Sequence, residues 1–463
     1  MSLRPVYDSR QAAPDTRFVA LRGMVTDGHK YAQAAYDLGC RHFVVEEEIE
    51  SLPRDAEQEV VENSRIALSR LSAEYFAYPS SELTVIAVTG TKGKTTVVNY
   101  LEQILGHAGR TVGTIGTNGV HYLDVYEETV NTTPESYELQ RILRQMVDAG
   151  VDTVCMEASS AGMMMHRVDD LDFDIAVYMN LSPDHIGPRE HSDFDDYKEC
   201  KARLFDLSPV GIVNIDDPHA EAMLRSEVNR TFSIHQPSDY QATDLSLEPR
   251  LETSFTVNGH KYHVPSPGEF SVYNALACLA CGIELGIDVS VLAEGLRQVH
   301  VDGRVHHIDD LPGVEVVVDY AHNRIAMTNL LESLRAYEPS RLCVLFGSVG
   351  GRTYGRRKEL GDVVAELADV AILTSDNPDR EDPEKILDYI EASFAGSSCV
   401  VYREADRALA IELAVSLAKP GDTLVFAGKG HEKAQLVDGE WLPHDEIGLV
   451  RAACQRAALL REI

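Results

Sequence analysis

The chain has 463 residues, 44% of them hydrophobic, which is enough for two or three domains with separate cores. Its 74 acidic and 42 basic residues give a formal net charge of -32, which argues against a nucleic-acid-binding or membrane-binding surface, because such surfaces need clustered lysine and arginine. No secretory signal and no apolar run of about 18 residues is present, so we expect a cytoplasmic protein, and its eight scattered cysteines are expected to be reduced and buried.

Apolar runs of strand length alternate with amphipathic stretches of helix length through most of the sequence. The strand-length runs lie at residues 83–88, 151–157, 174–180, 210–215, 314–319, 342–346, 369–375 and 423–427. Because their apolar residues are nearly continuous, these runs are typical of parallel strands that helices cover on both faces. The sequence therefore predicts an α/β protein.

Two turn-rich segments divide the sequence into three predicted domains. The first segment is PSSE at 79–82, which follows a helical stretch, and the second is VDGRVHHIDDLPG, which starts at residue 301. We expect a small N-terminal α/β domain at 1–79, a central domain at 80–301 and a C-terminal domain at 302–463.

The stretch VIAVTGTKGKTTVVNYLEQIL places a buried strand, a Gly/Thr turn and an amphipathic helix in succession. Backbone N–H groups in such a turn and at the helix N-terminus bind phosphate. Lys94 supplies a positive charge for the β- and γ-phosphates, and the Thr95 hydroxyl is a ligand for Mg²⁺. The spacing departs from GxxxxGK[ST], since Val88 stands at the first glycine position, and a turn without nucleotide is the alternative. The predicted ATP-binding residues of this loop are Thr89, Gly90, Thr91, Lys92, Gly93, Lys94, Thr95 and Thr96.

Four further stretches follow in a fixed order: NTTPESYELQ at 131–140, MEASSAGMMMHRV at 156–168, NLSPDHIGPREH at 180–191 and YKECKARLF at 197–205. Together with TGTKGKTT they resemble the Mur ligase family. Other stretches extend the likeness over nearly the whole chain: DSR at 8–10, FVALRGMVTDGH at 18–29, GEFSVYNALA at 268–277, DGR at 302–304, DYAHN at 319–323 and AGKGHE at 427–432. The resemblance is closest to members that add the third residue of the peptidoglycan peptide. It implies a UDP-sugar-binding N-terminal domain, a central P-loop ATPase-type domain with a parallel sheet, and a Rossmann-like C-terminal domain that binds the amino acid.

The resemblance also implies that ATP phosphorylates a carboxylate of the substrate. Because the phosphate and the carboxylate are both anions, cations must offset their repulsion, and the family uses a Mg²⁺ site for this. With Thr95, its metal residues are Glu157, His185 and Lys201, the last as a carbamate formed with CO₂. Without the neighbouring motifs, the alternative interpretation would be that Glu157 and His185 are solvated loop residues and that Lys201 is a surface lysine of a helix. We expect Lys94, Glu157, His185 and Lys201 to be the catalytic residues.

Four residues outside the loop resemble nucleotide contacts of the family. Asn274 matches an adenine-contacting asparagine, Arg304 an arginine that reaches the ATP phosphates, and Asp319 and His322 a motif on the nucleotide side. The alternative is that DGR is an interdomain turn and DYAH a strand end.

The contacts for the UDP-muramoyl dipeptide are also inferred from the resemblance. Two departures affect them, since relatives commonly have histidine in place of Ala161 and glutamine in place of Met165. The predicted residues for this substrate are Ser9, Arg10, Asn131, Thr132, Thr133, Ser159 and Arg167.

The loop TSDNPDRED at 374–382 bears on the choice of amino acid. In relatives that add meso-diaminopimelate the loop reads DNPR, but here Asp379 takes the place of the arginine and Arg380 is displaced by one residue. An aspartate repels a carboxylate and attracts an ammonium, so we expect a diamino acid with a terminal ammonium group, with L-lysine favoured over L-ornithine. The alternative, meso-diaminopimelate, is favoured by Arg352 and Glu432. The predicted amino-acid-binding residues are Arg352, Asp376, Asn377, Asp379, Gly428 and Glu432.

The resemblance implies an ATP-dependent ligase of peptidoglycan precursor synthesis that requires Mg²⁺. It joins a free diamino acid to the D-glutamyl γ-carboxylate of UDP-N-acetylmuramoyl-L-alanyl-D-glutamate through an acyl phosphate. We expect a monomer that binds neither nucleic acid nor membranes. One alternative is a folylpolyglutamate synthase, a family that lacks the N-terminal block with DSR and DGH. The other is a nucleotide-binding regulatory protein, which leaves Glu157, His185 and Lys201 unexplained.

Overall fold

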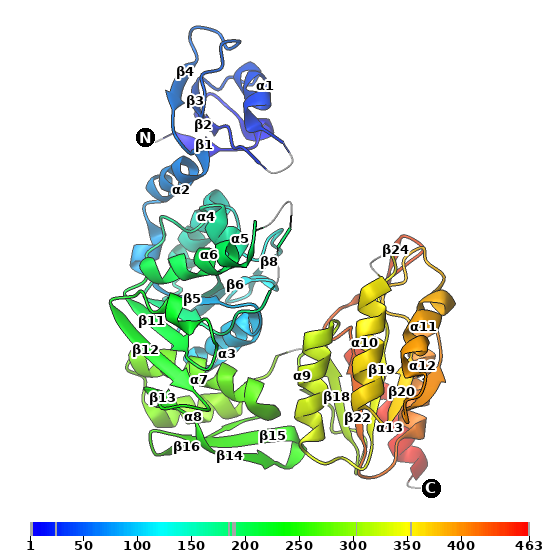
Figure 1. Ribbon diagram of the computed structural model, residues 1–463. Coiled ribbons are helices and arrows are strands. Elements are labelled where there is room, and N and C mark those ends of the chain that lie inside the picture. The colour runs from blue at the N-terminus through cyan, green and yellow to red at the C-terminus, as the bar shows by residue number, and fades with distance from the viewer. Residues whose placement is uncertain are drawn as a thin grey trace. The chain divides into compact units, whose positions relative to one another are not determined.

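The computed structural model describes residues 3–23, 26–183, 186–187, 191–301, 303–351 and 354–461 (Figure 1). The chain forms two compact units: the first joins Met1–Ala242 with Tyr273–Leu296, and the second joins Thr243–Val272 with Arg297–Ile463. Both are α/β, as predicted, and all eight cysteines are buried, as predicted. Compact units are defined by packing alone, so the domain boundaries at residues 79 and 301 stay predictions. Within the described part of the chain, none of the helices has the length and apolar character needed to cross a membrane.

The first unit begins with a parallel sheet in the order β1-β2-β3-β4. Its strands are β1 (Arg4–Val6), β2 (Thr16–Val19), β3 (His42–Val45) and β4 (Glu57–Val60). Side chains alternate between the two faces of a strand, so Phe18 packs with the helix α1 (Ala32–Asp37) and Val19 with α2 (Ser64–Tyr75). The side chain of Asn63 accepts hydrogen bonds from the first N–H groups of α2, which fixes where that helix starts.

A nine-stranded sheet forms the larger part of the first unit, in the order β13-β12-β11-β10-β5-β9-β6-β7-β8. All neighbours from β13 to β6 are parallel, and β7 and β8 are antiparallel additions at one edge. The strands are β5 (Thr84–Thr89), β6 (Val112–Gly116), β7 (Gly119–Tyr122), β8 (Val125–Glu127), β9 (Thr153–Glu157), β10 (Ile175–Tyr178), β11 (Val210–Asn214), β12 (Val228–Ser233) and β13 (Tyr240–Gln241).

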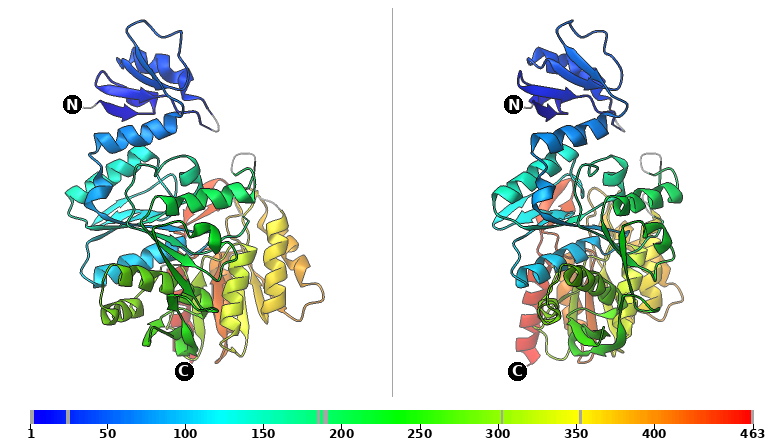
Figure 2. Two further views of the ribbon diagram at one scale, coloured as in Figure 1. Left: turned by 60° about the vertical axis from the view of Figure 1, so that its left-hand side comes forward. Right: turned by 90° about the vertical axis from the view of Figure 1, so that its left-hand side faces the viewer.

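Helices cover both faces of this sheet (Figure 2). One face, which includes Val85 and Ala87, packs against α4 (Ser136–Asp148), α5 (Ser160–Met164) and α6 (Phe194–Asp206). The helices that contact the other face or lie beside it are α3 (Lys94–His107), α7 (Gly268–Glu284) and α8 (Val289–Arg297). The helix α3 follows β5 directly, which places the Gly/Thr turn at the carboxyl edge of the sheet.

The second unit contains a six-stranded sheet in the order β17-β18-β22-β19-β20-β21, parallel except for β17. The strands are β17 (His306–His307), β18 (Glu315–Asp319), β19 (Leu342–Phe346), β20 (Val370–Leu373), β21 (Val400–Arg403) and β22 (Thr423–Ala427). One face packs against α9 (Arg324–Arg335), α10 (Tyr354–Leu367) and α11 (Pro383–Glu391). The other face packs against α12 (Arg407–Leu417) and α13 (Glu446–Arg461).

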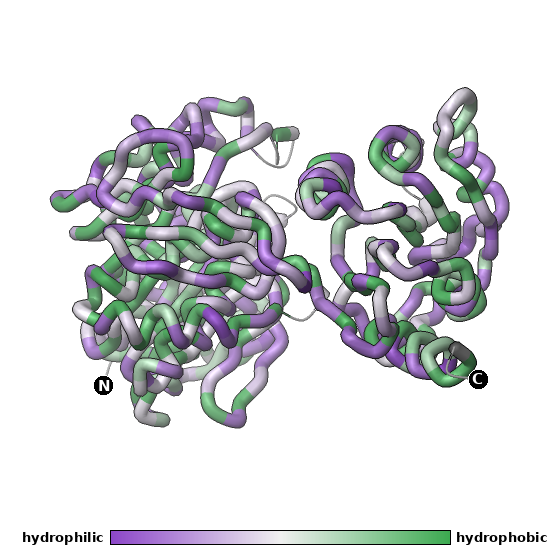
Figure 3. The backbone as a smooth tube through the Cα atoms, turned by 90° about the horizontal axis from the view of Figure 1, so that it is seen from below, coloured by the Kyte–Doolittle hydropathy of each residue, from purple (hydrophilic) through white to green (hydrophobic). Residues whose placement is uncertain are grey.

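Hydrophobic and hydrophilic residues both recur along the backbone of the second unit (Figure 3), and α9 and α11 are the helices with a clear apolar face. Two smaller antiparallel sheets complete the unit. Their strands are β14 (Thr243–Glu248), β15 (Glu252–Val257) and β16 (His260–Val264), and the hairpin of β23 (Ala434–Val437) and β24 (Glu440–Pro443).

Candidate functional site

The Gly/Thr turn between β5 and α3 has the geometry of a phosphate-binding loop. Gly93 precedes the helix with φ 90°, a torsion that L side chains rarely adopt. A Cβ atom on Gly93 would lie 2.9 Å from Asn274 Oδ1, so only glycine lets α7 approach this closely. The helix then starts at Lys94, and its first N–H groups are those that bind phosphate in such loops.

Glu157 and Thr95, both predicted metal residues, lie in contact. Val88 at the end of β5 pairs with Glu157 at the end of β9, so the strand register brings this carboxylate to the loop. The Thr95 hydroxyl donates to Glu157 Oε1 at 2.9 Å, and the N–H of Thr117 donates to the same oxygen at 2.9 Å. Glu157 is 2% exposed. A buried carboxylate beside a hydroxyl forms an oxygen donor set that suits Mg²⁺.

Lys201 is buried at this site instead of lying on the surface of its helix. Its side chain is 2% exposed, and Nζ donates to Gly90 O at 3.1 Å and lies 4.7 Å from the centre of the Tyr197 ring. Lys94 Nζ donates to the same Gly90 oxygen at 2.8 Å. Two amines that are cations in water therefore converge on one carbonyl group. His185, the remaining predicted metal residue, lies outside the described residues.

Asn274 has the property expected of a nucleotide contact. It is 2% exposed, and its Oδ1 has no hydrogen-bond partner among the described residues. A buried amide oxygen without a partner is unfavourable, and an exocyclic amino group such as that of adenine would satisfy it. This acceptor and the N–H donors of the loop together therefore fit ATP.

Asn180 holds the loop from the neighbouring strand and was not predicted. Its carbonyl oxygen accepts from Thr91 N, and its side chain bonds the N–H and the carbonyl of Lys92. The signal for it was present, because Asn180 opens the stretch NLSPDHIGPREH, but its role depends on the pairing of β10 with β5.

Four of the residues predicted for the UDP-muramoyl dipeptide come together beside Glu157. Thr133 Oγ1 donates to the carbonyl of Glu157 at 2.9 Å and lies 3.0 Å from Ser159 Oγ. Arg167 Nη1 donates to Thr133 O at 2.9 Å, and Thr132 Oγ1 lies 3.2 Å from Thr117 Oγ1.

The other three predicted residues for this substrate lie elsewhere. Asn131 is exposed. Ser9 and Arg10 lie in the N-terminal sheet region, where Asp8 accepts from Arg10 and holds its exposed guanidinium at 2.6 Å.

Three residues predicted for the nucleotide belong to the second unit. Asp319 accepts from the N–H groups of Val305 and Ala321 at 2.7 Å each, and burial raises the pKa of this carboxyl. Arg304 lies with its guanidinium carbon 5.0 Å from the centre of the Tyr320 ring. His322 is partly buried, which lowers its pKa.

A cavity of about 240 Å³ opens at the carboxyl ends of the strands in the second unit. The strand pairing explains its position, since β18 ends beside β22 and β19 ends beside β20. Of the predicted amino-acid-binding residues, the lining includes Asp376, Asn377, Gly428 and Glu432. The other lining residues are Tyr320, His322, Ser348, Val349, Arg356 and Trp441. We call this cavity the amino-acid pocket.

Asp379 and Arg380 are absent from the described lining of the amino-acid pocket. Asp379 has φ 52° and bonds the β23–β24 hairpin through its backbone, accepting from Asp438 N and donating to Leu436 O. The expectation that Asp379 contacts the substrate therefore has no geometric support. Arg352 lies outside the described residues. Arg356, which was not predicted, is the arginine of the described lining.

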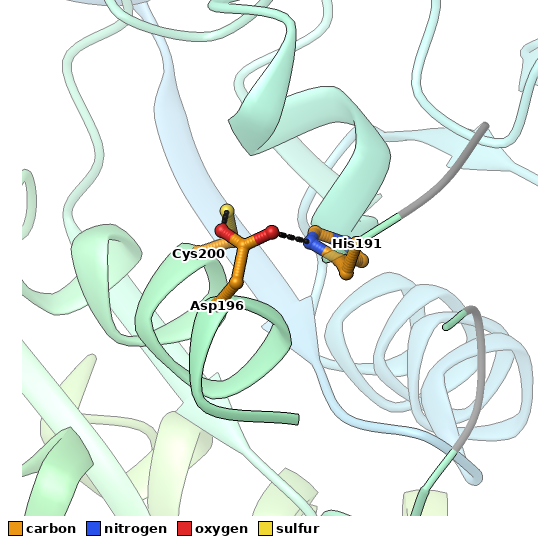
Figure 4. Close-up of side chains that lie close together, drawn as sticks. All are labelled: His191, Asp196 and Cys200. Atoms are coloured by element: carbon orange, nitrogen blue, oxygen red, sulfur yellow. Dashed lines mark hydrogen bonds and ion pairs between the residues drawn. The ribbon is translucent and has the colours of Figure 1, made fainter. Parts of the chain in front are cut away.

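His191, Asp196 and Cys200 form a cluster at the start of α6, the helix that carries Lys201 (Figure 4). Their ligand-type atoms lie within 4.8 Å of one another. His191 Nδ1 lies 3.3 Å from one oxygen of Asp196, and Cys200 Sγ donates to the other at 3.7 Å. Ser192 N also donates to Asp196, so hydrogen bonds account for this arrangement, and we assign no ion to it.

Comparison with known proteins identifies two family domains in the chain. The Mur ligase middle domain matches residues 88–282, and the Mur ligase, glutamate ligase domain matches residues 303–430. The first match includes the Gly/Thr turn at residues 89–96, and the second includes the loop at 374–382.

Individual relatives align over most of this chain. A protein of Caldanaerobacter subterraneus is 35% identical over 457 residues, which are 96% of this chain and 93% of the relative. One of Clostridium perfringens is 34% identical over 453 residues, 95% and 92% of the two chains. Both are named UDP-N-acetylmuramoyl-L-alanyl-D-glutamate--2,6-diaminopimelate ligase. A solved structure of a ligase with that name superposes with a TM-score of 0.76 at 30% identity, covering 98% of this chain and 95% of its own.

Proposed function

Because the chain belongs to the Mur ligase family of ATP-dependent amide ligases, we propose that it adds the third residue of the peptidoglycan peptide. The substrates are ATP, UDP-N-acetylmuramoyl-L-alanyl-D-glutamate and meso-diaminopimelate. The N-terminal sheet region binds the UDP end, the phosphate loop binds ATP, and the amino-acid pocket binds the diamino acid. We also propose that the protein acts as a monomer.

The observation that carries the proposal is the convergence of Lys94 and Lys201 on Gly90 O, on the loop that also holds the Thr95–Glu157 pair. A ligase of this kind must bring a phosphate and a carboxylate together, and cations and metal-ligating oxygens offset their repulsion. A non-catalytic nucleotide switch has no need for a second buried amine at this place.

The residues present fit Mg²⁺ and ATP. Glu157 and the Thr95 hydroxyl would hold the ion, which when bound neutralises phosphate charge. Lys94 would stabilise the negative charge that develops on the γ-phosphate. Its amine already lies at the loop, where it donates to the carbonyls of Gly90 and Thr91. Asn274 would accept from the adenine amino group with the oxygen that otherwise lacks a partner.

Lys201 is proposed to act as a carbamate. Two ammonium groups that share one carbonyl oxygen repel each other, and the repulsion is strong where water is excluded. A neutral Lys201 amine that adds to CO₂ and loses a proton becomes an anion. This change replaces repulsion from Lys94 with attraction and adds oxygen donors at Gly90, on the loop that precedes Thr95.

In the proposed reaction, an oxygen of the D-glutamyl γ-carboxylate attacks the γ-phosphorus of ATP, and ADP leaves. The acyl phosphate is then attacked by the α-amine of the diamino acid, and phosphate leaves from the tetrahedral intermediate with the carboxylate oxygen. Thr133, Ser159 and Arg167 are proposed to hold the dipeptide, because they lie around the end of β9 next to Glu157.

The proposal of meso-diaminopimelate replaces the expectation of lysine. The expectation rested on Asp379, which does not belong to the described lining of the pocket, and relatives that match over nearly the whole chain are named as diaminopimelate ligases. The pocket offers both signs of charge, with Arg356 for a carboxylate and Asp376 and Glu432 for an ammonium group. The far end of meso-diaminopimelate carries both groups, whereas that of lysine carries only the ammonium.

The experiment is an assay of phosphate release from ATP with UDP-N-acetylmuramoyl-L-alanyl-D-glutamate and one of three amino acids. We expect turnover with meso-diaminopimelate and little with L-lysine or L-ornithine. Preference for lysine would overturn the amino-acid assignment but leave the ligase assignment in place. Absence of turnover with all three would overturn the assignment to this reaction. Turnover with a folate substrate in place of UDP-N-acetylmuramoyl-L-alanyl-D-glutamate would indicate a folylpolyglutamate synthase.

A further inference from the structure

A buried arginine, Arg407, lies beneath the amino-acid pocket without lining it. Arg407 and Glu446, the first residues of α12 and α13, are 2% and 0% exposed. Arg407 Nε donates to both oxygens of Glu446, at 3.1 and 2.9 Å, and Nη2 donates to Oε1 at 2.6 Å. His444 Nε2 lies 2.6 Å from the other Glu446 oxygen, so the carboxylate is held from two sides.

The rest of the guanidinium bonds the backbone of two pocket loops. Nη1 donates to Ser375 O and Nη2 donates to Ala427 O, both at 3.0 Å. The next residues in the chain are Asp376 and Gly428, which both line the amino-acid pocket. One rigid, planar group therefore fixes the spacing of two loops at the point where each enters the pocket.

A second buried cation ties the same loops from the side. Lys429 is fully buried, and its Nζ donates to Asn377 Oδ1 and to Glu432 Oε2, both at 2.7 Å. Asn377 and Glu432 line the pocket. Lys429 thus joins the two loops at residues that line the pocket, and Arg407 joins them one residue before the lining begins.

Stability alone does not require a charge at this position. A buried ion pair pays a desolvation penalty, and apolar residues of similar volume are often as stable or more so. An apolar side chain would fill the space of Arg407, but it would leave the carbonyls of Ser375 and Ala427 without these donors. The loops would then be free to change their spacing.

We propose that Arg407, oriented by Glu446, is a positioning residue that sets the geometry of the amino-acid pocket and so the affinity for the incoming diamino acid. This inference rests on the proposed function. Arg407 acts through Asp376 and Gly428 and does not touch the substrate.

The same sheet offers a matched control at the amino ends of its strands. Arg341 and Asp422 precede β19 and β22, and Arg341 Nε donates to Asp422 Oδ1 at 3.1 Å. Arg341 Nη2 also donates to a carbonyl, Leu417 O, at 2.9 Å. This pair resembles Arg407–Glu446 in chemistry, but it lies a strand length, roughly 15 Å, away from the carboxyl ends that form the pocket.

The test compares the full-length variants R407M, R407K, R407M/E446M and R341M. For each, KM is measured for all three substrates and stability is measured by urea unfolding. We expect R407M to raise KM for the diamino acid about 100-fold, since small misplacements of binding groups have effects of this size, with unchanged KM for ATP. R407K retains a donor for one carbonyl and should show a smaller increase. R341M should lower stability and leave KM unchanged.

The double variant separates positioning from folding. R407M/E446M removes both charges, so we expect it to regain the stability that R407M loses but to keep the raised KM. The proposal is overturned if the double variant regains the wild-type KM, or if R341M raises that KM as much as R407M. If R407M does not fold, R407K and the double variant carry the same comparison. The wild-type assay tests the proposed function separately, because the variants are compared with whichever amino acid the wild type accepts.

Discussion

The phosphate loop of the first unit and the amino-acid pocket of the second both form at the carboxyl ends of parallel strands, but different interactions hold them. Contiguous residues from Thr89 to Thr96 form the loop, with left-handed glycine torsions at Gly90 (φ 149°) and Gly93 (φ 90°). Asn180 bonds it from the end of the neighbouring strand. The pocket draws on segments far apart in the sequence, which the buried cations Arg407 and Lys429 tie together. A ligand shared by many proteins can be bound by a local motif, whereas the choice of substrate depends on tertiary contacts.

Replacing Lys201 has the largest expected effect on the phosphate-loop side of this comparison. Lys201→Ala should lower kcat about 1000-fold, because the site loses charge that stabilises the transition state, and a short carboxylic acid should restore part of it. The control is Lys198→Ala on the same helix, where the side chain is partly exposed and pairs with Asp195; it should leave kcat unchanged. Full activity of Lys201→Ala would contradict the carbamate role.

Arginine replacements sharpen the comparison on the pocket side. Arg356→Ala should raise KM for meso-diaminopimelate about 10- to 100-fold, the size expected for a lost bond to a charged group. Arg380→Ala should have no effect, because Arg380 is exposed and absent from the described lining. Trp441, the single tryptophan of the chain, lines the pocket, so its fluorescence gives binding independently of turnover. A raised KM in Arg380→Ala alone would contradict the role of Arg356 and would indicate that Arg380 contacts the diamino acid.

A pair of glycines isolates the close approach at the phosphate loop. Gly93 and Gly109 have similar torsions, φ 90° and 86°, but a Cβ on Gly93 would meet Asn274, whereas one on Gly109 would meet nothing within 4 Å. Both alanine variants should lose about 1 kcal/mol of stability from the torsion. Only Gly93→Ala should raise KM for ATP, about tenfold, and equal KM values in the two variants would remove the argument from close approach.

The titration of Glu446 is expected to change stability only in acid, so its effect at neutral pH is the smallest of those predicted. Burial would raise its pKa, but the charge of Arg407 and the bond to His444 lower it from 4.5 to about 2. Because the folded-state pKa is depressed, this group stabilises the fold above pH 4.5, and that stabilisation is lost as the pH falls from 4.5 towards 2. Urea unfolding of Glu446→Gln should therefore show a shallower loss of stability in this window than the wild type. Identical slopes would contradict it.

The sequence was sufficient for the fold class and for the strand–turn–helix geometry of the phosphate loop, because strand and helix periodicity and the GKTT turn are local. It also contained Asn180, whose clamp on the loop depends on the neighbouring strand. It was not sufficient for Arg356, Arg407 or Lys429, since the positions and partners of these cations are set by packing. The role of Asp379 stays a prediction without geometric support: the conformation of this residue is fixed by backbone bonds to the β23–β24 hairpin, which the sequence alone does not reveal.

The transfer of one oxygen atom tests the account's central claim most directly. UDP-N-acetylmuramoyl-L-alanyl-D-glutamate labelled with ¹⁸O in the γ-carboxylate is turned over with ATP and meso-diaminopimelate, and the released phosphate is analysed by mass spectrometry. Attack of that carboxylate on the γ-phosphate predicts one ¹⁸O atom in each phosphate formed during amide synthesis. Phosphate without label, released at the rate of amide formation, would contradict an acyl phosphate and with it the proposed use of the site.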